Sequence, residues 1–247
     1  MKPKVAFFDF AGCEGDQLAI LELEHELPEI LGLVEIVNFR EAIDDRRDDY
    51  DIAFLEGSIT RPADLPRIQK IRENAKICVA IGACATTGGV NSIKNLAPDL
   101  EEVRRYVYGE KAHCFDTFAT RPMKAVIKVD YELHGCPINK YEFVELLKCL
   151  LAGRPFVNKN YPLCVECKQN GNICVFHKKM ACLGPITRAG CNSICPNNGN
   201  KCEGCRGLVD DPNTETAREV LSEFGYGVED ILREFTLFNT FTEAPQK

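Results

Sequence analysis

Cysteine is concentrated in one part of this chain. Of the 14 cysteines among 247 residues, eight lie within residues 164–205, close to one residue in five. A cytosol keeps thiols reduced, so this density indicates metal ligands rather than disulfides. The surrounding segment is rich in Gly, Asn and Pro and shows little periodicity, so it cannot bury enough apolar side chains to fold alone. We expect bound metal to supply the missing stability.

The eight cysteines have the number and spacing that two iron–sulfur clusters require. In order they are Cys164-x-x-Cys167, Cys174, Cys182, Cys191, Cys195-Pro196 and Cys202-x-x-Cys205. The Cys-Pro pair matches the end of bacterial ferredoxin motifs, in which four thiolates hold one 4Fe–4S cluster. The alternative is a zinc ribbon built from the two C-x-x-C pairs, which would make the chain a zinc-binding interaction module. Zinc would leave the other four cysteines of this segment without a role.

The part of the chain before this segment alternates between strand and helix patterns. Buried strands are expected at 5–10, 34–39, 52–55, 77–81 and 125–129. Helices are expected at 16–27, 63–74, 88–95, 99–108 and 140–151, with a further helix at 214–233. Alternating strands and helices predict an α/β domain, a parallel sheet covered on both faces. We expect domains at 1–153 and 154–247, with sites gathered beyond the carboxyl ends of the strands.

Three further cysteines follow predicted strands, where a parallel sheet presents its functional edge. Cys13, Cys84 and Cys136 each have glycine neighbours, which allow backbone to approach a bulky ligand. Three thiolates leave one iron of a third cluster without a protein ligand. Asp16 follows Cys13 at the spacing of a C-x-x-C pair, and we infer that it is the fourth ligand. The alternative is that Asp16 only caps the following helix, a position that suits aspartate.

These assignments use twelve ligands for three clusters and leave three cysteines over. Cys78 lies inside a predicted strand and Cys149 on an apolar helix face, so both are expected in the core. Cys114 has no clear role. No residue of the chain is expected to be catalytic, and no G-x-G-x-x-G nucleotide motif follows any predicted strand.

Charge and hydropathy exclude several classes of partner. The net charge of −7 argues against a non-specific nucleic-acid role. No apolar run approaches the roughly 20 residues of a membrane span, so we expect no membrane partner. The start of the chain predicts a strand rather than a signal peptide, and we expect a cytoplasmic location. Phe235, Phe238 and Phe241 recur every three residues near the end; they either pack on the body or dock a partner subunit.

The pattern resembles the small, electron-transferring subunit of nickel–iron hydrogenases over nearly the whole chain. Within that family it is similar to the delta subunit of cytosolic, NADP-linked sulfhydrogenases. The residues that carry the resemblance are the Cys13 loop, Glu56-Gly57, Gly82-Ala83-Cys84-Ala85-Thr86-Thr87-Gly88-Gly89, Gly135-Cys136-Pro137, Cys164-Val165-Glu166-Cys167-Lys168, Cys182-Leu183-Gly184-Pro185-Ile186-Thr187 and Cys202-Glu203-Gly204-Cys205-Arg206-Gly207.

The resemblance implies a flavodoxin-like domain that holds a proximal cluster beside the large subunit's nickel–iron centre. A second, small and irregular domain would hold a medial and a distal cluster. Carried over in order, the ligands would be Cys13, Asp16, Cys84 and Cys136 for the proximal cluster, Cys164, Cys167, Cys174 and Cys182 for the distal one, and Cys191, Cys195, Cys202 and Cys205 for the medial one. The chain departs from the usual family pattern at Asp16, which replaces a cysteine. It departs from the exported members at Cys164, which replaces their distal histidine, and at Cys195, where many of them have proline.

The function implied is electron relay, through three 4Fe–4S clusters, between the nickel–iron site of a large subunit and a flavin/NADP(H) reductase module. Its partners would be that large subunit and further iron–sulfur and flavin subunits of a heterotetramer. The alternative within the same class is the small subunit of a deazaflavin-reducing or heterodisulfide-reductase-linked hydrogenase.

Overall fold

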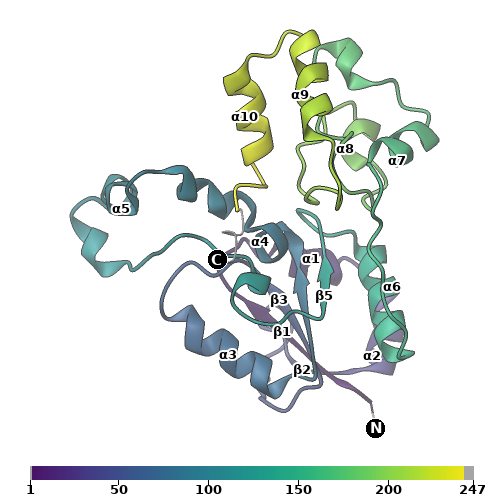
Figure 1. Cartoon of the computed structure of the whole chain (residues 1–247). Helices are drawn as coiled ribbons and strands as arrows, with labels where there is room; N and C mark the ends of the chain where they lie inside the picture. The colour runs from purple at the N-terminus through teal and green to yellow at the C-terminus, as the bar shows by residue number, and fades with distance from the viewer. Residues whose placement is uncertain (1, 242–247) are drawn as a thin grey trace.

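The computed structural model describes residues 2–241 (Figure 1). Its strands are β1 (Lys4–Asp9), β2 (Glu35–Asn38), β3 (Ile52–Glu56), β4 (Ile77–Ile81) and β5 (Tyr131–Leu133). Its α-helices are α1 (Gly15–Leu21), α2 (Leu27–Leu33), α3 (Asp64–Asn74), α4 (Gly82–Thr87), α5 (Leu100–Tyr108), α6 (Lys140–Leu151), α7 (Cys164–Gln169), α8 (Ile194–Asn197), α9 (Thr214–Glu223) and α10 (Val228–Thr236). Short 3₁₀ helices are η1 (Gly89–Leu96), η2 (Gly109–Cys114), η3 (Met123–Ala125) and η4 (Val175–Lys178).

Within the described residues, the five strands form one parallel sheet in the order β2-β1-β3-β4-β5. This is the flavodoxin-like, doubly wound order. The predicted α/β class with a flavodoxin-like sheet is therefore confirmed. Because all strands are parallel, their carboxyl ends meet at one edge, where the loops after β1, β4 and β5 lie.

Helices cover both faces of the sheet, and each face has its own core. On one face, α1, α2 and α6 contribute Ile20, Ile30 and Phe143 to a cluster built around Phe7 and Phe54. On the other face lie α3, α4 and η3, whose buried side chains include Ile68, Ala85 and Met123. The sheet itself supplies apolar side chains to both faces, as a fully buried parallel sheet must.

The strand expected at 125–129 is wrong. Ala125 ends η3, residues 126–129 form no strand, and the last strand of the sheet is β5. The stretch is apolar because Ile127 packs under the sheet in the same core as α3, with Val126 and Val129 partly buried beside it. The chain is held before β5 by Asp130, whose carboxylate accepts a hydrogen bond of 2.9 Å from the backbone N–H of Cys78.

Three expected helices also differ from the structure. The helix expected at 16–27 ends at Leu21, and α2 follows with Pro28 in its first turn, where proline is well tolerated. The helix expected at 88–95 is the 3₁₀ helix η1. The single helix expected at 214–233 is broken into α9 and α10 around Gly225, whose φ of +89° a helix interior does not allow.

The cysteine-rich segment and the last helices lie together above the carboxyl edge of the sheet (Figure 1). Leu183 and Ile186 of the cysteine-rich loops pack with Leu221 of α9 and Ile231 of α10 in a small separate core. This core spans fewer residues than either core of the sheet, so the loops keep few apolar contacts of their own. The boundary near residue 153 stays a prediction.

The tail after α10 returns to the sheet domain. Phe238 is buried, and its backbone carbonyl accepts a hydrogen bond of 2.9 Å from the Thr87 hydroxyl of α4. Phe235 packs partly buried against the core that α9 and α10 share. The phenylalanine stripe therefore packs on the body of the protein within the described residues.

Candidate functional site

Cys13, Cys84 and Cys136 lie in the three loops at the carboxyl edge of the sheet. Cys13 stands between β1 and α1, Cys84 lies in the first turn of α4, and Cys136 follows β5. The α4 and β5 loops are tied by a 2.6 Å hydrogen bond from Ala83 N–H to the Gly135 carbonyl. Burial, and next the charges of Cys136, Asp16 and Cys13, raise the pKa of Cys84 to about 12. The structure thus brings the three thiols and Asp16 into one electrostatic neighbourhood, although they come from distant parts of the sequence.

Asp16 reaches from α1 into the other two loops. Its side chain is buried, and its Oδ1 accepts a 2.8 Å hydrogen bond from the backbone N–H of Ile138, two residues beyond Cys136. Its Oδ2 packs against Gly82, where an added Cβ would lie only 1.7 Å away; glycine is required there also because φ is +84°. Burial, and next the charge of Glu56, raise the pKa of Asp16 to about 7.

The helix-capping role that sequence allowed for Asp16 belongs instead to Glu56. The Glu56 carboxylate, at the end of β3, accepts hydrogen bonds from the backbone N–H groups of Asp16 (3.1 Å) and Gln17 (3.0 Å). These N–H groups open α1 and have no partner inside the helix. Sequence reasoning treated Glu56 only as part of a family motif; its position at the end of a buried strand is the signal that could have placed it.

The Cys84 thiol has free space beside it and a hydrogen-bond donor nearby. The Asn91 amide lies 3.7 Å from Cys84 Sγ and also donates to the Ala11 carbonyl at 2.8 Å. A Cβ on Gly89 would approach Cys84 Sγ to 2.8 Å, so only glycine leaves space beside this thiol. Thiols with free space and N–H donors around them match the surroundings that cluster sulfurs need. The donor set at this edge therefore fits an iron–sulfur cluster.

A second group of thiols surrounds a small cavity next to α7. The cavity is lined by Cys164, Cys167, Cys174 and Cys182, with Gly184 and Pro185 on one side. A Cβ on Gly184 would lie 3.3 Å from the Sγ of Cys164 and 3.4 Å from that of Cys182, so the glycine keeps space between these two thiols. Burial, and next the charges of the other three thiols, raise the pKa of Cys164 to about 11. Thiols of this kind must lose protons when metal binds.

The third group lines the cavity between the sheet domain and the cysteine-rich loops. This cavity of about 440 Å³ is bordered by Cys191, Cys195, Cys202 and Cys205, and on the sheet side by Cys136. Cys202 also donates its backbone N–H to Cys182 Sγ at 3.2 Å, so the second and third groups adjoin. The three groups are thus neighbours, and the third lies between the other two.

The two C-x-x-C pairs do not meet. Cys164 and Cys167 line the cavity at α7, whereas Cys202 and Cys205 line the interdomain cavity. Over residues 2–241, no three or more His, Cys, Asp or Glu side chains gather closely enough to hold one metal ion. The four thiols that a zinc ribbon would use are therefore divided between two cavities.

A buried arginine joins the two parts of the molecule. Arg206 donates to the carbonyls of Ala189 (2.8 Å) and His134, and its Nη2 pairs with the Glu142 carboxylate at 2.8 Å. Gly190, at φ +127°, makes room for the Arg206 side chain, because a Cβ there would lie 2.0 Å from the guanidinium. Sequence reasoning missed this contact, because nothing in the sequence marks which arginine is buried.

The remaining cysteines lie away from these groups. Cys78 is fully buried in β4 and Cys149 is buried on α6, as expected of core residues. Cys114 is exposed at the end of η2, with its Sγ 3.3 Å from His113 Nε2. Among the helices described, none is both long and apolar enough to cross a bilayer.

The sequence has relatives along most of its length. A family model described as the NADH ubiquinone oxidoreductase 20 kDa subunit matches residues 13–150. The delta subunit of sulfhydrogenase 2 from Pyrococcus furiosus is 35% identical over 222 residues, covering 89% of this chain and 92% of the relative. A subunit of the F420-non-reducing hydrogenase vhu from Methanocaldococcus jannaschii is 30% identical over 273 residues, covering 97% of this chain and 94% of the relative.

Solved structures share the fold. A chain of an NAD⁺-reducing nickel–iron hydrogenase in the H₂-reduced state superposes with a TM-score of 0.58 at 25% identity, over 63% of this chain and 94% of that one. A chain of the nickel–iron–selenium hydrogenase from Desulfomicrobium baculatum gives 0.57 at 16% identity, over 87% and 98%. The second likeness supports the fold alone.

Proposed function

This chain belongs to the family of the NADH ubiquinone oxidoreductase 20 kDa subunit and, within it, to the small subunits of nickel–iron hydrogenases, and we propose that it relays electrons through three 4Fe–4S clusters. The observation that carries the proposal is the division of eleven thiols and Asp16 among three adjoining groups, one at the sheet edge and two in cavities. A row of neighbouring sites is what stepwise electron transfer needs.

Each group would hold one cluster, and each cluster would supply a one-electron carrier. The proximal ligands proposed are Cys13, Asp16, Cys84 and Cys136; the medial ligands are Cys191, Cys195, Cys202 and Cys205; the distal ligands are Cys164, Cys167, Cys174 and Cys182. What the chain itself does is position these donors and donate backbone N–H groups toward them, as Cys202 does to Cys182. Asp16 is supported as the fourth proximal ligand because Glu56, and not Asp16, caps α1.

The large subunit is proposed to cover the sheet edge and the arm beside it. The arm, residues 97–118, carries α5 and η2 and stands away from the sheet in Figure 1. Tyr106 is 91% exposed and Val107 60% exposed, and α5 buries none of its residues. The arm continues directly from η1, whose Asn91 lies against Cys84. Exposed apolar side chains on an arm that follows the Asn91 segment beside Cys84 are what a partner carrying the nickel–iron site would bury.

The electron acceptor is proposed to be a flavin/NADP(H) reductase module reached through further iron–sulfur subunits. The support is the 35% identity to a sulfhydrogenase delta subunit. The 30% identity to a subunit of an F420-non-reducing hydrogenase keeps the small subunit of a heterodisulfide-reductase-linked hydrogenase as the second candidate. The cytoplasm is the proposed location, because a reducing compartment keeps the ligand thiols free for metal.

Co-purification tests this proposal. The full chain, carrying an affinity tag and isolated without oxygen, should bring with it a nickel-containing subunit and a flavoprotein, and the complex should reduce NADP⁺ with dihydrogen. A complex with nickel but without flavin, reducing no nicotinamide, would favour the second candidate. A chain isolated without any nickel protein and without dihydrogen oxidation would contradict the proposed function.

A further inference from the structure

The loops around the α7 cavity are basic, although the chain is acidic. Residues 154–202 contain seven Lys or Arg residues and one acidic residue, Glu166, whereas the whole chain has 37 acidic against 30 basic residues. Glu166 is itself buried, between Lys159 and the backbone N–H of Gly190. The excess positive charge of this segment therefore lies on its surface.

Ion pairs neutralise only part of that charge. The paired residues are Lys159 with Glu166, Arg188 with Asp210 and Lys201 with Glu234. Arg154 lies in the linker after α6. The other three, Lys168, Lys178 and Lys179, are exposed, and no ion pair within the described part of the chain includes them.

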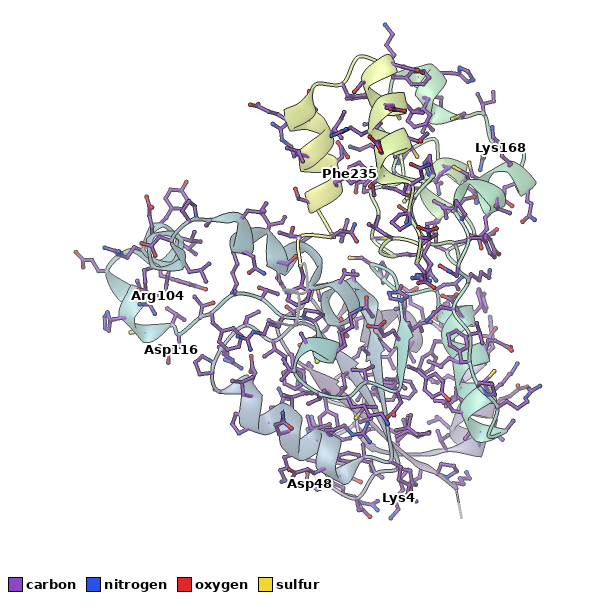
Figure 2. The ribbon with its side chains drawn as sticks, in the orientation of Figure 1. Lys4, Asp48, Arg104, Asp116, Lys168 and Phe235 are labelled. Carbon is purple, nitrogen blue, oxygen red and sulfur yellow. The ribbon has the colours of Figure 1, made fainter. Side chains whose placement is uncertain are left out.

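Of these three lysines, Lys168 lines the cavity that holds the proposed distal ligands, and Lys178 and Lys179 closely follow its lining residues Val175 and Phe176 in the chain. Lys168 follows Cys167 on α7 and lines the cavity, and Figure 2 shows it on the outer side of the molecule. Lys178 ends η4 and Lys179 follows it, shortly after Cys174. The acidic helix α9 packs nearby, with Phe224 at its end stacked on Phe176 at 4.9 Å, yet its carboxylates form no ion pair with these lysines within residues 2–241.

The same segment exposes two apolar side chains. Ile173 is 74% exposed and Val165 is 42% exposed, each beside a proposed distal cysteine. An apolar centre with a charged border is the pattern of a protein-docking surface. Charges at such a border steer encounter and select a partner of opposite sign.

We propose that this basic face, formed by Val165, Lys168, Ile173, Lys178 and Lys179, docks an iron–sulfur carrier protein or domain whose own surface is acidic. The inference rests on the proposed function, because it takes the α7 cavity to hold the distal cluster. Each dihydrogen oxidised on the large subunit releases two protons and two electrons. Two single-electron reductions of the docked carrier balance that reaction.

The test compares two charge-reversed forms of the complex of this chain with its large subunit, isolated without oxygen. One carries Lys168→Glu, Lys178→Glu and Lys179→Glu. The matched control carries Lys70→Glu, Lys76→Glu and Lys128→Glu, which reverse as many exposed lysines on and near α3, at the other end of the molecule. Dihydrogen-dependent reduction is measured with an acidic bacterial two-cluster ferredoxin, a basic cytochrome c and benzyl viologen.

The basic-face variant should raise the KM for ferredoxin at least about tenfold at low salt and lower it for cytochrome c, because steering changes sign. The KM of the control variant for ferredoxin and for cytochrome c should stay within about twofold of the wild-type value. Added salt should raise the wild-type KM for ferredoxin and leave that of the basic-face variant nearly unchanged.

A wild-type KM for ferredoxin that ignores salt, or equal KM values in the two variants, would overturn the docking proposal. Viologen reduction and iron content of the wild type report separately on the proposed function. If the wild type reduces viologen but does not reduce ferredoxin, the docking surface is wrong and the electron relay stands. If it neither holds iron–sulfur nor reduces viologen, the relay itself is refuted.

Discussion

Asp16 has one role that the structure shows, as a hydrogen-bond acceptor, and a second that we propose, as a cluster ligand. Its Oδ1 is already hydrogen-bonded to the Ile138 N–H at 2.8 Å. Asparagine keeps an acceptor oxygen at that position but loses the negative charge that iron would bind. The substitution Asp16→Asn therefore separates the two roles, which Asp16→Ala cannot do.

We expect Asp16→Asn to lose or labilise the proximal cluster while the other two clusters remain, a loss of about one third of the iron. Asp16→Cys should retain all three clusters and shift the proximal signal in redox-titrated electron paramagnetic resonance, since a thiolate is a softer donor. Iron content is measured together with that titration. If Asp16→Asn has the iron content of the wild type and an unshifted proximal potential, Asp16 is only a hydrogen-bond acceptor and not a ligand.

Arg206 lies outside the proposed ligand set, but its loss should cost considerable stability. Removing it leaves the Glu142 carboxylate and two carbonyls without their donor in a buried place, which costs about 3–5 kcal/mol. Arg206→Ala should therefore lower the apparent unfolding temperature of the chain by roughly 6–20 °C.

Arg47 provides the matched control for that measurement. It makes two ion pairs, with Glu35 and Asp49, on the exposed surface. Exposed pairs contribute less than about 1 kcal/mol, so Arg47→Ala should shift the unfolding temperature little. Equal shifts for the two variants would show that Arg206 does not hold the cysteine-rich loops to the sheet domain.

At the scale of elements, the arm formed by α5 and η2 is largely exposed: α5 buries none of its residues and η2 buries Ala112. It is joined to the body near its base, where Lys94 Nζ meets the Thr117 hydroxyl at 2.6 Å and Phe118 N–H bonds the Thr60 carbonyl at 2.9 Å. Figure 2 shows Arg104 and Asp116 on this arm, far from the sheet. A base held by hydrogen bonds and the exposed side chains of Tyr106 and Val107 suit an arm that packs on another subunit.

If the large subunit covers the arm, Tyr106→Asp with Val107→Asp should weaken its association by at least about 2 kcal/mol, because two unpaired charges would enter an interface. Leu33→Asp is the control, since Leu33 is also exposed but lies on α2, away from the arm. Retention of the large subunit on the tagged chain is compared at matched salt. Equal retention in both variants would exclude the arm from the interface.

We expect the loops that carry the thiols to depend on bound clusters more than on packing. Leu183 and Ile186 are among the few buried apolar residues that these loops contribute to the core with α9 and α10. Cys205→Ser should therefore destabilise the loops as a whole, because ligand loss is loss of folding energy. Cys149→Ala, in the core of α6, should cost only about 1 kcal/mol and leave iron content unchanged. Iron content and proteolysis of the two variants are compared; a similar loss of iron from both would contradict the ligand assignment.

For the whole molecule, the sequence predicts the frame of the fold better than its details. The first four strands are found close to their expected positions, because apolar runs between turn signals are typical of buried parallel strands. The sequence predicts a fifth strand at 125–129, because an apolar loop that packs under the sheet has the same composition as a strand. Its true position, Tyr131–Leu133, is a three-residue edge strand with little signal of its own.

The prediction of functional-site residues from sequence is limited in a similar way. Spacing predicts the eight thiols of residues 164–205 as ligands, because metal ligands recur at short fixed intervals, and position after a strand predicts Cys13, Cys84 and Cys136. Spacing did not identify Glu56 or Arg206, because their roles depend on contacts between segments 40 and more residues apart. Burial of a charged side chain is decided by tertiary packing and leaves no local pattern in the sequence.

The central claim is that the chain holds three 4Fe–4S clusters, and metal analysis tests it most directly. The full chain, purified without oxygen, is assayed for iron, acid-labile sulfide and zinc per polypeptide. We predict about twelve iron and about twelve sulfide, with zinc near zero. Stoichiometric zinc without sulfide would contradict the claim and favour a zinc-binding interaction module.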